Sequence, residues 1–174
     1  FIRICINTTM KKTYSGFWKP KHPKKYNGNI DNIYYRSLWE RNAFRYLDKA
    51  SWVKWWHSEE TVIPYVCSTD RKMHRYFIDL TIRTDTGRTL LVEIKPSHQT
   101  KPPKRKKLNE ALVYMKNTSK WKYAKKFCEE RGYEFQIWTE KELEALGIKT
   151  MTMRFKASKT KTGKRIWKTL KKRV

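Results

Sequence analysis

The 174-residue chain carries 41 Lys and Arg against 16 Asp and Glu, which gives a formal net charge of +25 at pH 7. An excess of this size excludes an ordinary neutral metabolic enzyme and indicates a polyanionic partner. Because 39% of the residues are hydrophobic and 14% aromatic, the chain can also form a packed core and is not merely a disordered basic tail. The length fits one domain.

The basic residues gather at the two ends of the chain. Residues 1–28 hold seven Lys and Arg and no acid, and residues 149–174 hold eleven and again no acid. This distribution predicts a globular domain at 29–148, flanked by a basic N-terminal arm (1–28) and a basic C-terminal tail (149–174). Such arms neutralise phosphates without sequence preference, although solubilising tails would look the same.

Three further sequence features narrow the class of protein. Cys5, Cys67 and Cys128 are widely spaced, which argues against a disulfide framework or a zinc ribbon and fits a reducing compartment. No apolar run approaches the ~18 residues of a membrane helix, so we expect no membrane partner. Met10 opens a stretch typical of a natural protein start, unlike Phe1, and residues 1–9 are therefore expected to be upstream sequence.

Taken in chain order, the hydrophobic periodicity predicts a helix at 33–48 and strands at 52–56, 61–66, 73–83 and 88–95. A long helix at 108–128, a strand at 133–139 and a short closing helix at 140–146 follow. Asp31 and Asn32 are expected to cap the first helix, and Gly132 to end the long one. This order predicts an α/β fold with a mixed β-sheet flanked by helices.

The hairpin around the loop 85–87 brings two acids together. With Gly87 in the left-handed position, cross-strand pairing places Asp79 directly opposite Glu93, and Lys95 follows two residues further on. The other face of the hairpin would be apolar, through the pairs Ile78–Ile94, Leu80–Val92 and Ile82–Leu90.

Two directly opposed carboxylates repel each other unless a cation lies between them. Hard oxygen ligands favour Mg²⁺, or Mn²⁺ in its place. Lys95 would stabilise charge developing on a phosphate or orient a water, with a pKa lowered only modestly because the acids favour its charged form. The alternative is an exposed hairpin face on which Glu93 simply pairs with Lys95.

Glu40 interrupts the apolar stripe of the first predicted helix, close to Ala43, Phe44 and Leu47 on a helical wheel. A carboxylate buried there is unfavourable unless it is paired. Either Arg36, four residues earlier, pairs with it, or Glu40 reaches toward Asp79 and Glu93 and completes a metal site.

The residues Tyr-Phe-Ile-Asp at 76–79 and Val-Glu-Ile-Lys at 92–95 resemble the PD-(D/E)XK nuclease motif, with Ile78 in the place usually held by Pro. The wider run is more specific. Over about residues 13–146 the chain resembles the head completion nucleases of T-even-like tailed bacteriophages, relatives of the TnsA-type transposon endonucleases, in the segments 33–40, 58–60, 63–65, 74–77, 94–96 and 98–103.

The resemblance implies a restriction-endonuclease-like fold and metal-dependent cleavage of DNA. By position, Glu40, Asp79 and Glu93 match the metal-binding acids and Lys95 the motif lysine, while His74 and Gln99 lie in matching segments as auxiliary candidates. It also implies a late role on packaged DNA, when filled heads are joined to tails. The partners would be phage head or portal-vertex proteins, and the location the virion and the host cytoplasm.

A basic loop follows the hairpin, with Lys101, Lys104, Arg105, Lys106 and Lys107. We expect it to bind double-stranded DNA largely without sequence preference, because no recognition helix is apparent. Two alternatives remain open: a TnsA-like transposon-end or branched-DNA endonuclease, and a non-catalytic DNA-binding virion protein.

Overall fold

The computed structural model describes residues 14–103, 108–150, 155–159 and 165–169, the last two ranges by their backbone only. Of the predicted DNA-binding loop, Lys101 is described and exposed, whereas Lys104, Arg105, Lys106 and Lys107 lie outside the described residues. Residues 1–13, which include the predicted start at Met10, also lie outside them.

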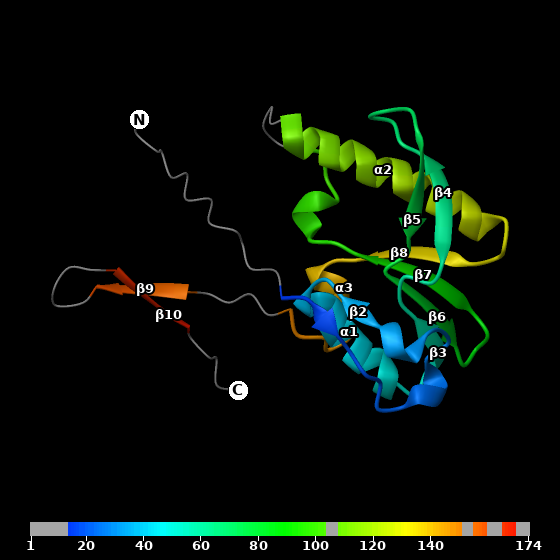
Figure 1. Cartoon of the computed structure of the whole chain (residues 1–174), viewed down its shortest axis with the longest axis horizontal. Helices are drawn as coiled ribbons and strands as arrows, with labels where there is room; N and C mark the ends of the chain where they lie inside the picture. The colour runs from blue at the N-terminus through cyan, green and yellow to red at the C-terminus, as the bar shows by residue number, and fades with distance from the viewer. Residues whose placement is uncertain (1–13, 104–107, 151–154, 160–164, 170–174) are drawn as a thin grey trace.

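A mixed four-stranded sheet forms the centre of the molecule (Figure 1). Its strands lie in the order β3 (Val53–His57), β6 (Leu80–Thr84), β7 (Thr89–Ile94) and β8 (Glu134–Trp138). Neighbours are antiparallel except for β7 and β8, which are parallel and joined by a helical crossover. All six residues of β7 are buried, because helices cover both faces of the sheet. The predicted mixed sheet flanked by helices is confirmed.

Two apolar clusters lie on opposite faces of this sheet. The first packs under α1 (Leu38–Lys49) and α3 (Glu140–Ala145) and includes Phe44, Leu80, Val92 and Leu143. The second packs between the sheet, the hairpin of β4 (Val62–Val66) and β5 (Met73–Phe77), and α2 (Leu108–Glu129). Its buried members are Ile63, Tyr65, Cys67, Tyr76, Ile78, Leu91, Ala124 and Cys128.

The predicted strand 73–83 is two strands, so the prediction of one continuous strand was wrong. β5 pairs with β4, and the chain then turns before β6 joins the central sheet. The backbone N–H of Ile78 donates to the carbonyl oxygen of Thr61 at 3.0 Å. Ile78 therefore belongs to the second apolar cluster rather than facing Ile94, which belongs to the first.

The predicted pairs Leu80–Val92 and Ile82–Leu90 are confirmed, whereas the predicted pair Asp79–Glu93 is not part of the β6–β7 ladder. Gly87 adopts φ 85°, as the three-residue loop requires. The long helix α2 ends near the predicted stop signal, where Gly132 has φ 65°. The predicted last strand and closing helix are present as β8 and α3.

The first helix begins at Leu38, five residues later than predicted. Ser37, not Asp31 or Asn32, is the N-cap, and its side chain accepts a hydrogen bond from the backbone N–H of Glu40 at 3.2 Å. The preceding residues form the 3₁₀ helix η2 (Ile30–Asn32) and the strand β2 (Tyr34–Tyr35), which pairs with β1 (Gly16–Phe17).

Part of the predicted N-terminal arm packs onto the domain. Tyr26, which follows the 3₁₀ helix η1 (Pro23–Lys25), is buried against Trp56, and Trp18 packs against the same ring. In the predicted C-terminal tail, β9 (Phe155–Lys159) pairs with β10 (Arg165–Thr169) in an antiparallel hairpin, which the charge pattern alone did not predict. The domain boundaries at 28 and 149 stay predictions.

Candidate active site

Asp79 lies where the chain passes from β5 to β6. Its Oδ2 accepts a hydrogen bond of 2.8 Å from the backbone N–H of Ile94, at the end of β7. The strand ladder itself begins at the pair Leu80–Val92, so Asp79 reaches β7 through its side chain rather than as a ladder partner of Glu93. Burial, and then the charge of Glu93, raise the pKa of Asp79 well above its ordinary value. The prediction that Asp79 lies directly opposite Glu93 in the ladder was therefore wrong, although the charge of Glu93 still acts on Asp79.

Glu93 is only 2% exposed, and both of its carboxylate oxygens have partners. The ammonium of Lys95 lies 2.9 Å from Oε1, and the hydroxyl of Tyr76 donates to Oε2 at 2.7 Å. Glu93 is therefore buried, whereas the side chain of Lys95 is 26% exposed. The Glu93–Lys95 pair of the alternative is present, but not on a solvent-exposed hairpin face. A buried carboxylate held in this way has its orientation set by two elements, β5 and β7.

Lys95 remains charged in this setting. Burial alone would lower the pKa of its ammonium, but the charges of Glu93, Asp79 and Glu40 outweigh burial, and the pKa is raised. The expected modest lowering was therefore wrong, because three carboxylates act on this lysine rather than two. Lys95 is a hydrogen-bond donor at neutral pH and not a free base.

Glu40 projects from the first turn of α1. Its Oε1 accepts from the hydroxyl of Ser37 at 2.8 Å, and its Oε2 accepts from the backbone N–H of Arg36 at 2.7 Å. The guanidinium of Arg36 binds Glu59, at 2.8 and 3.2 Å. Arg36 therefore satisfies Glu40 as the alternative expects, but through its backbone N–H and not through an ion pair. Burial raises the pKa of Glu40, and the charge of Lys95 opposes this rise.

The charge of Glu40 acts on Asp79 and on Lys95, which also feel the charge of Glu93. Within the described ranges, the oxygens of the three acids do not all lie within 4.8 Å of one another. The donor types nevertheless fit a hard divalent cation, because carboxylate oxygens are its preferred ligands and three carboxylates act electrostatically on one ammonium. The raised pKa values of Asp79 and Glu40 fit this excess of acid, since neighbouring carboxylates add to the effect of burial at both.

The two auxiliary candidates, His74 and Gln99, have partners other than the three acids among the contacts of the described residues. The imidazole of His74 pairs with Asp70, with Nε2 2.9 Å from Oδ2. Gln99 ends the 3₁₀ helix η3 (Ser97–Gln99) and, together with Lys101 and Tyr114, lines a pocket of about 290 Å³.

Two contributors were missed. Tyr76 stands in the quoted motif, but its spacing gives no sign that the hydroxyl holds Glu93. Glu59 lines a pocket of about 260 Å³ with Arg36, Tyr34 and Phe77, and its charge helps to raise the pKa of Glu40. Glu59 also has a φ of 56°, a conformation that is uncommon for non-glycine residues. The sequence alone does not reveal this backbone angle.

Comparisons with known proteins identify the chain as a member of a nuclease family. A family model described as TnsA-like endonuclease N terminal matches residues 51–140, and the chain belongs to this family. Its central sheet with flanking helices is the restriction-endonuclease-like fold. The chain is also similar to the head completion nuclease of Enterobacteria phage T4, at 42% identity over 146 residues, which covers 78% of this chain and 97% of that protein. The resemblance inferred from the motifs is confirmed.

Among the helices that the structure describes, none combines the length and the apolar character needed to cross a bilayer.

Proposed function

We propose that this protein is a metal-dependent deoxyribonuclease of the PD-(D/E)XK type that hydrolyses phosphodiester bonds of double-stranded DNA. The observation that carries the proposal is the buried Glu93 paired with the partly exposed Lys95, in a chain of the TnsA-like family. The charges of Asp79 and Glu40 also act on Lys95. Glu40, Asp79 and Glu93 would hold Mg²⁺, or Mn²⁺. Such an ion neutralises phosphate charge and acidifies a bound water.

The protein side chains have separate roles in this proposal. The raised pKa of Lys95 supports a role as a donor to the reacting phosphate or to the attacking water, rather than as the base that takes its proton. Tyr76 positions Glu93 through its hydrogen bond, and Ser37 positions Glu40. The exposed guanidinium of Arg36 lies at the adjoining pocket, next to where a phosphate chain would pass.

Affinity for DNA would come from charge. The basic arm at 1–28 and the tail at 149–174 would supply cations on either side of the nuclease domain at 29–148. A loop within the domain would add those of Lys101, Lys104, Arg105, Lys106 and Lys107. Phosphate contacts of this kind bind without base preference and weaken steeply with salt.

The biological context that we propose is phage assembly, on the basis of the similarity to a head completion nuclease. The enzyme would act on packaged DNA before filled heads join tails, in the virion and the host cytoplasm, with phage head or portal-vertex proteins as partners. The family match also supports a second candidate, a transposon-end or branched-DNA endonuclease. Comparing cleavage of branched and linear substrates separates the two, because only the second candidate prefers branches.

The catalytic claim is tested by cleavage of supercoiled plasmid with Mg²⁺ or with EDTA. Lys95→Met removes the ammonium with little change of volume, and we expect a loss of roughly 10²–10³-fold in rate with DNA binding retained. Lys141→Met, on the exposed surface of α3, is the matched control and should cleave normally. Circular dichroism verifies folding, because Lys95→Met leaves Glu93 buried without its cation. Undiminished cleavage by folded Lys95→Met, or cleavage in EDTA, would favour another cleavage chemistry. No cleavage by the wild type with Mg²⁺, with DNA binding intact, would favour a non-catalytic DNA-binding virion protein.

A further inference from the structure

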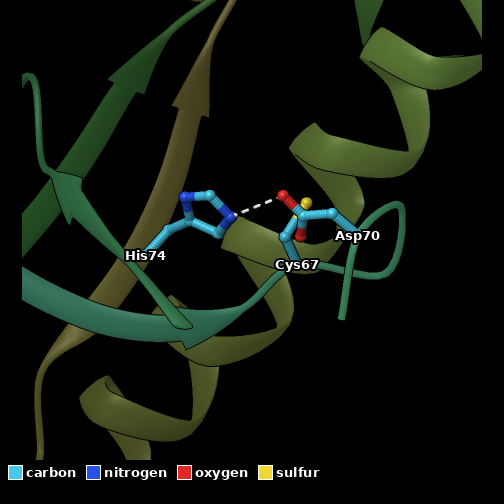
Figure 2. A group of neighbouring side chains, drawn as sticks. All are labelled: Cys67, Asp70 and His74. Atoms are coloured by element: carbon cyan, nitrogen blue, oxygen red, sulfur yellow. Dashed lines mark hydrogen bonds and ion pairs between the residues drawn. The ribbon is translucent and has the colours of Figure 1, made fainter. Parts of the chain in front are cut away.

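A second group of ligand-type side chains lies at the turn of the β4–β5 hairpin, apart from the acids described above. Sγ of Cys67, an oxygen of Asp70 and a ring nitrogen of His74 all lie within 4.8 Å of one another. Figure 2 shows the three side chains converging, with the imidazole directed at the carboxylate. Over the residues that the structure describes, no other three His, Cys, Asp or Glu side chains meet this spacing.

The turn that carries these side chains is held by its own backbone. The N–H of Cys67 donates to the carbonyl of Lys72 at 3.0 Å, and the N–H of Arg71 donates to the carbonyl of Cys67 at 2.8 Å. Arg71 has φ 57°, a conformation that non-glycine residues rarely adopt. The three donor groups are therefore presented by a defined loop, which reduces the entropy lost on binding a ligand.

The cluster is open on one side. Cys67 is 1% exposed and lies at the base, whereas the side chains of Asp70 and His74 are each 40% exposed. The hydroxyl of Thr69 lies 3.1 Å from the sulfur, and this contact lowers the pKa of the Cys67 thiol. An ion would meet Asp70 and His74 at the surface, with the sulfur of Cys67 beneath them.

The mixture of donors selects the metal. A thiolate, an imidazole and a carboxylate suit Zn²⁺, whereas Mg²⁺ prefers oxygen ligands alone. With metal–ligand distances of about 2.0–2.3 Å, donors around a tetrahedral Zn²⁺ lie about 3.3–3.8 Å apart, a spacing that side-chain rotation can reach here.

We propose that Cys67, Asp70 and His74 form a zinc site that closes the turn of the β4–β5 hairpin. A water completes the coordination, and binding releases the thiol proton of Cys67 to solvent. The site is separate from the proposed magnesium site and does not depend on it.

This hairpin is the element that supports the catalytic acids. The ring of His74 lies 5.7 Å from that of Tyr65, which in turn lies 6.3 Å from that of Tyr76. Tyr76 holds Glu93. Zinc at the turn would therefore stabilise the β4–β5 strand pair from which Tyr76 projects. The role of the ion would be structural.

Cobalt(II) titration of the full-length, metal-free protein tests this proposal. Co²⁺ replaces Zn²⁺ at such sites and gives a thiolate-to-metal absorption band. We expect one Co²⁺ per chain, a band that saturates and is removed by Zn²⁺, and a higher melting temperature with Zn²⁺. Cys67→Ser should abolish the band, and Asp70→Asn and His74→Gln should each weaken affinity at least about 10-fold.

Cys128→Ser and Cys5→Ser are the matched controls, since they remove the other two thiols of the chain, and both should keep the band. A band that is absent in the wild type, persists in Cys67→Ser or is lost in either control overturns the proposal. If Cys67→Ser does not fold, the exposed Asp70→Asn and His74→Gln variants decide, and unchanged Co²⁺ affinity in both overturns it. Plasmid cleavage plays no part in this readout, so failure here leaves the proposed nuclease activity unaffected.

Discussion

The hydroxyl of Tyr76 donates a 2.7 Å hydrogen bond to Oε2 of Glu93, and this bond joins two strands that belong to different sheets. β5 pairs only with β4 among the described strands, whereas β7 lies in the middle of the central sheet. The carboxylate is thereby held between the tyrosine on one side and Lys95 on the other. Its orientation depends on the packing of the hairpin against the sheet.

Tyr76→Phe removes this bond and keeps the ring. We expect cleavage at subsaturating Mg²⁺ to fall about 10–100-fold, as for other partners that orient metal ligands. The free energy of unfolding should fall by about 1.5–3 kcal/mol, because the lost bond is to a charged group. Tyr65→Phe, on the neighbouring strand, is the control. Cleavage equal to wild type in Tyr76→Phe would remove the tyrosine from the proposed site.

Ser37→Ala separates two roles of one hydroxyl. Loss of the helix cap should reduce the free energy of unfolding by about 1 kcal/mol. Loss of the hydrogen bond to Glu40 should in addition lower the rate of plasmid cleavage, because the carboxylate is no longer held. Thr139→Ala removes the comparable cap of α3, away from the site, and should lower stability alone. Equal cleavage by the two variants would show that Ser37 acts only as a cap.

Asp79→Asn should make the metal-free protein more stable while abolishing cleavage. The raised pKa of Asp79 means that its charged form is disfavoured by burial and by Glu93. An asparagine carries no charge and still accepts the hydrogen bond from Ile94. Urea denaturation at pH 7 in EDTA measures the effect. A lower midpoint in Asp79→Asn than in the wild type is incompatible with a repulsive cluster of acids.

The same pKa values predict a pH dependence. An acid whose pKa is raised on folding holds its proton in the folded state after the unfolded chain has lost it, so stability falls as pH rises through that window. Asp79 and Glu40 both behave in this way. In EDTA, the stability difference between Glu40→Gln and the wild type should therefore grow from about pH 4 upward. The free energy of unfolding of both proteins is measured over about pH 4–8 in steps of about one unit. A difference between them that stays constant over this range contradicts the raised pKa of Glu40.

The basic tail should govern the salt dependence of DNA binding. Each phosphate contact contributes about −0.9 to the slope of log K against log salt concentration. Removal of residues 149–174, which carry eleven Lys and Arg, should make this slope less steep by several units. Fluorescence anisotropy with duplexes of unrelated sequence measures the slope. An unchanged slope would mean that the tail is only a solubilising segment.

Much of the sheet was predictable because its pattern is local. The alternation of apolar residues around Leu80 and Val92, together with a glycine that needs positive φ, sets the hairpin register, and Gly132 ends α2. The turn at Ile78 was not predictable in the same way. The residues on both sides of it favour strands, and only the distant Thr61 takes its backbone N–H out of the ladder.

The candidate site likewise combines residues that the local sequence pattern predicts with features that depend on tertiary structure. Asp79, Glu93 and Lys95 follow from spacing along two strands, and Glu40 from an acid within an apolar stripe. The start of α1 depends on tertiary structure, because Asp31 and Ser37 are equally good caps and pairing of β1 with β2 keeps the intervening residues extended. The cluster of Cys67, Asp70 and His74 escaped notice because its spacing matches no common metal motif.

The central claim is that Glu40, Asp79 and Glu93 hold a divalent ion. An anomalous difference map from crystals soaked in Mn²⁺ tests it most directly, because Mn²⁺ replaces Mg²⁺ and is located independently of the protein density. The account predicts a peak in contact with the carboxylates of Asp79 and Glu93, on the side of Glu40, at about 2.0–2.4 Å from the nearest oxygens. A map with no peak at these acids, in crystals where the soaked ion appears elsewhere, would contradict it.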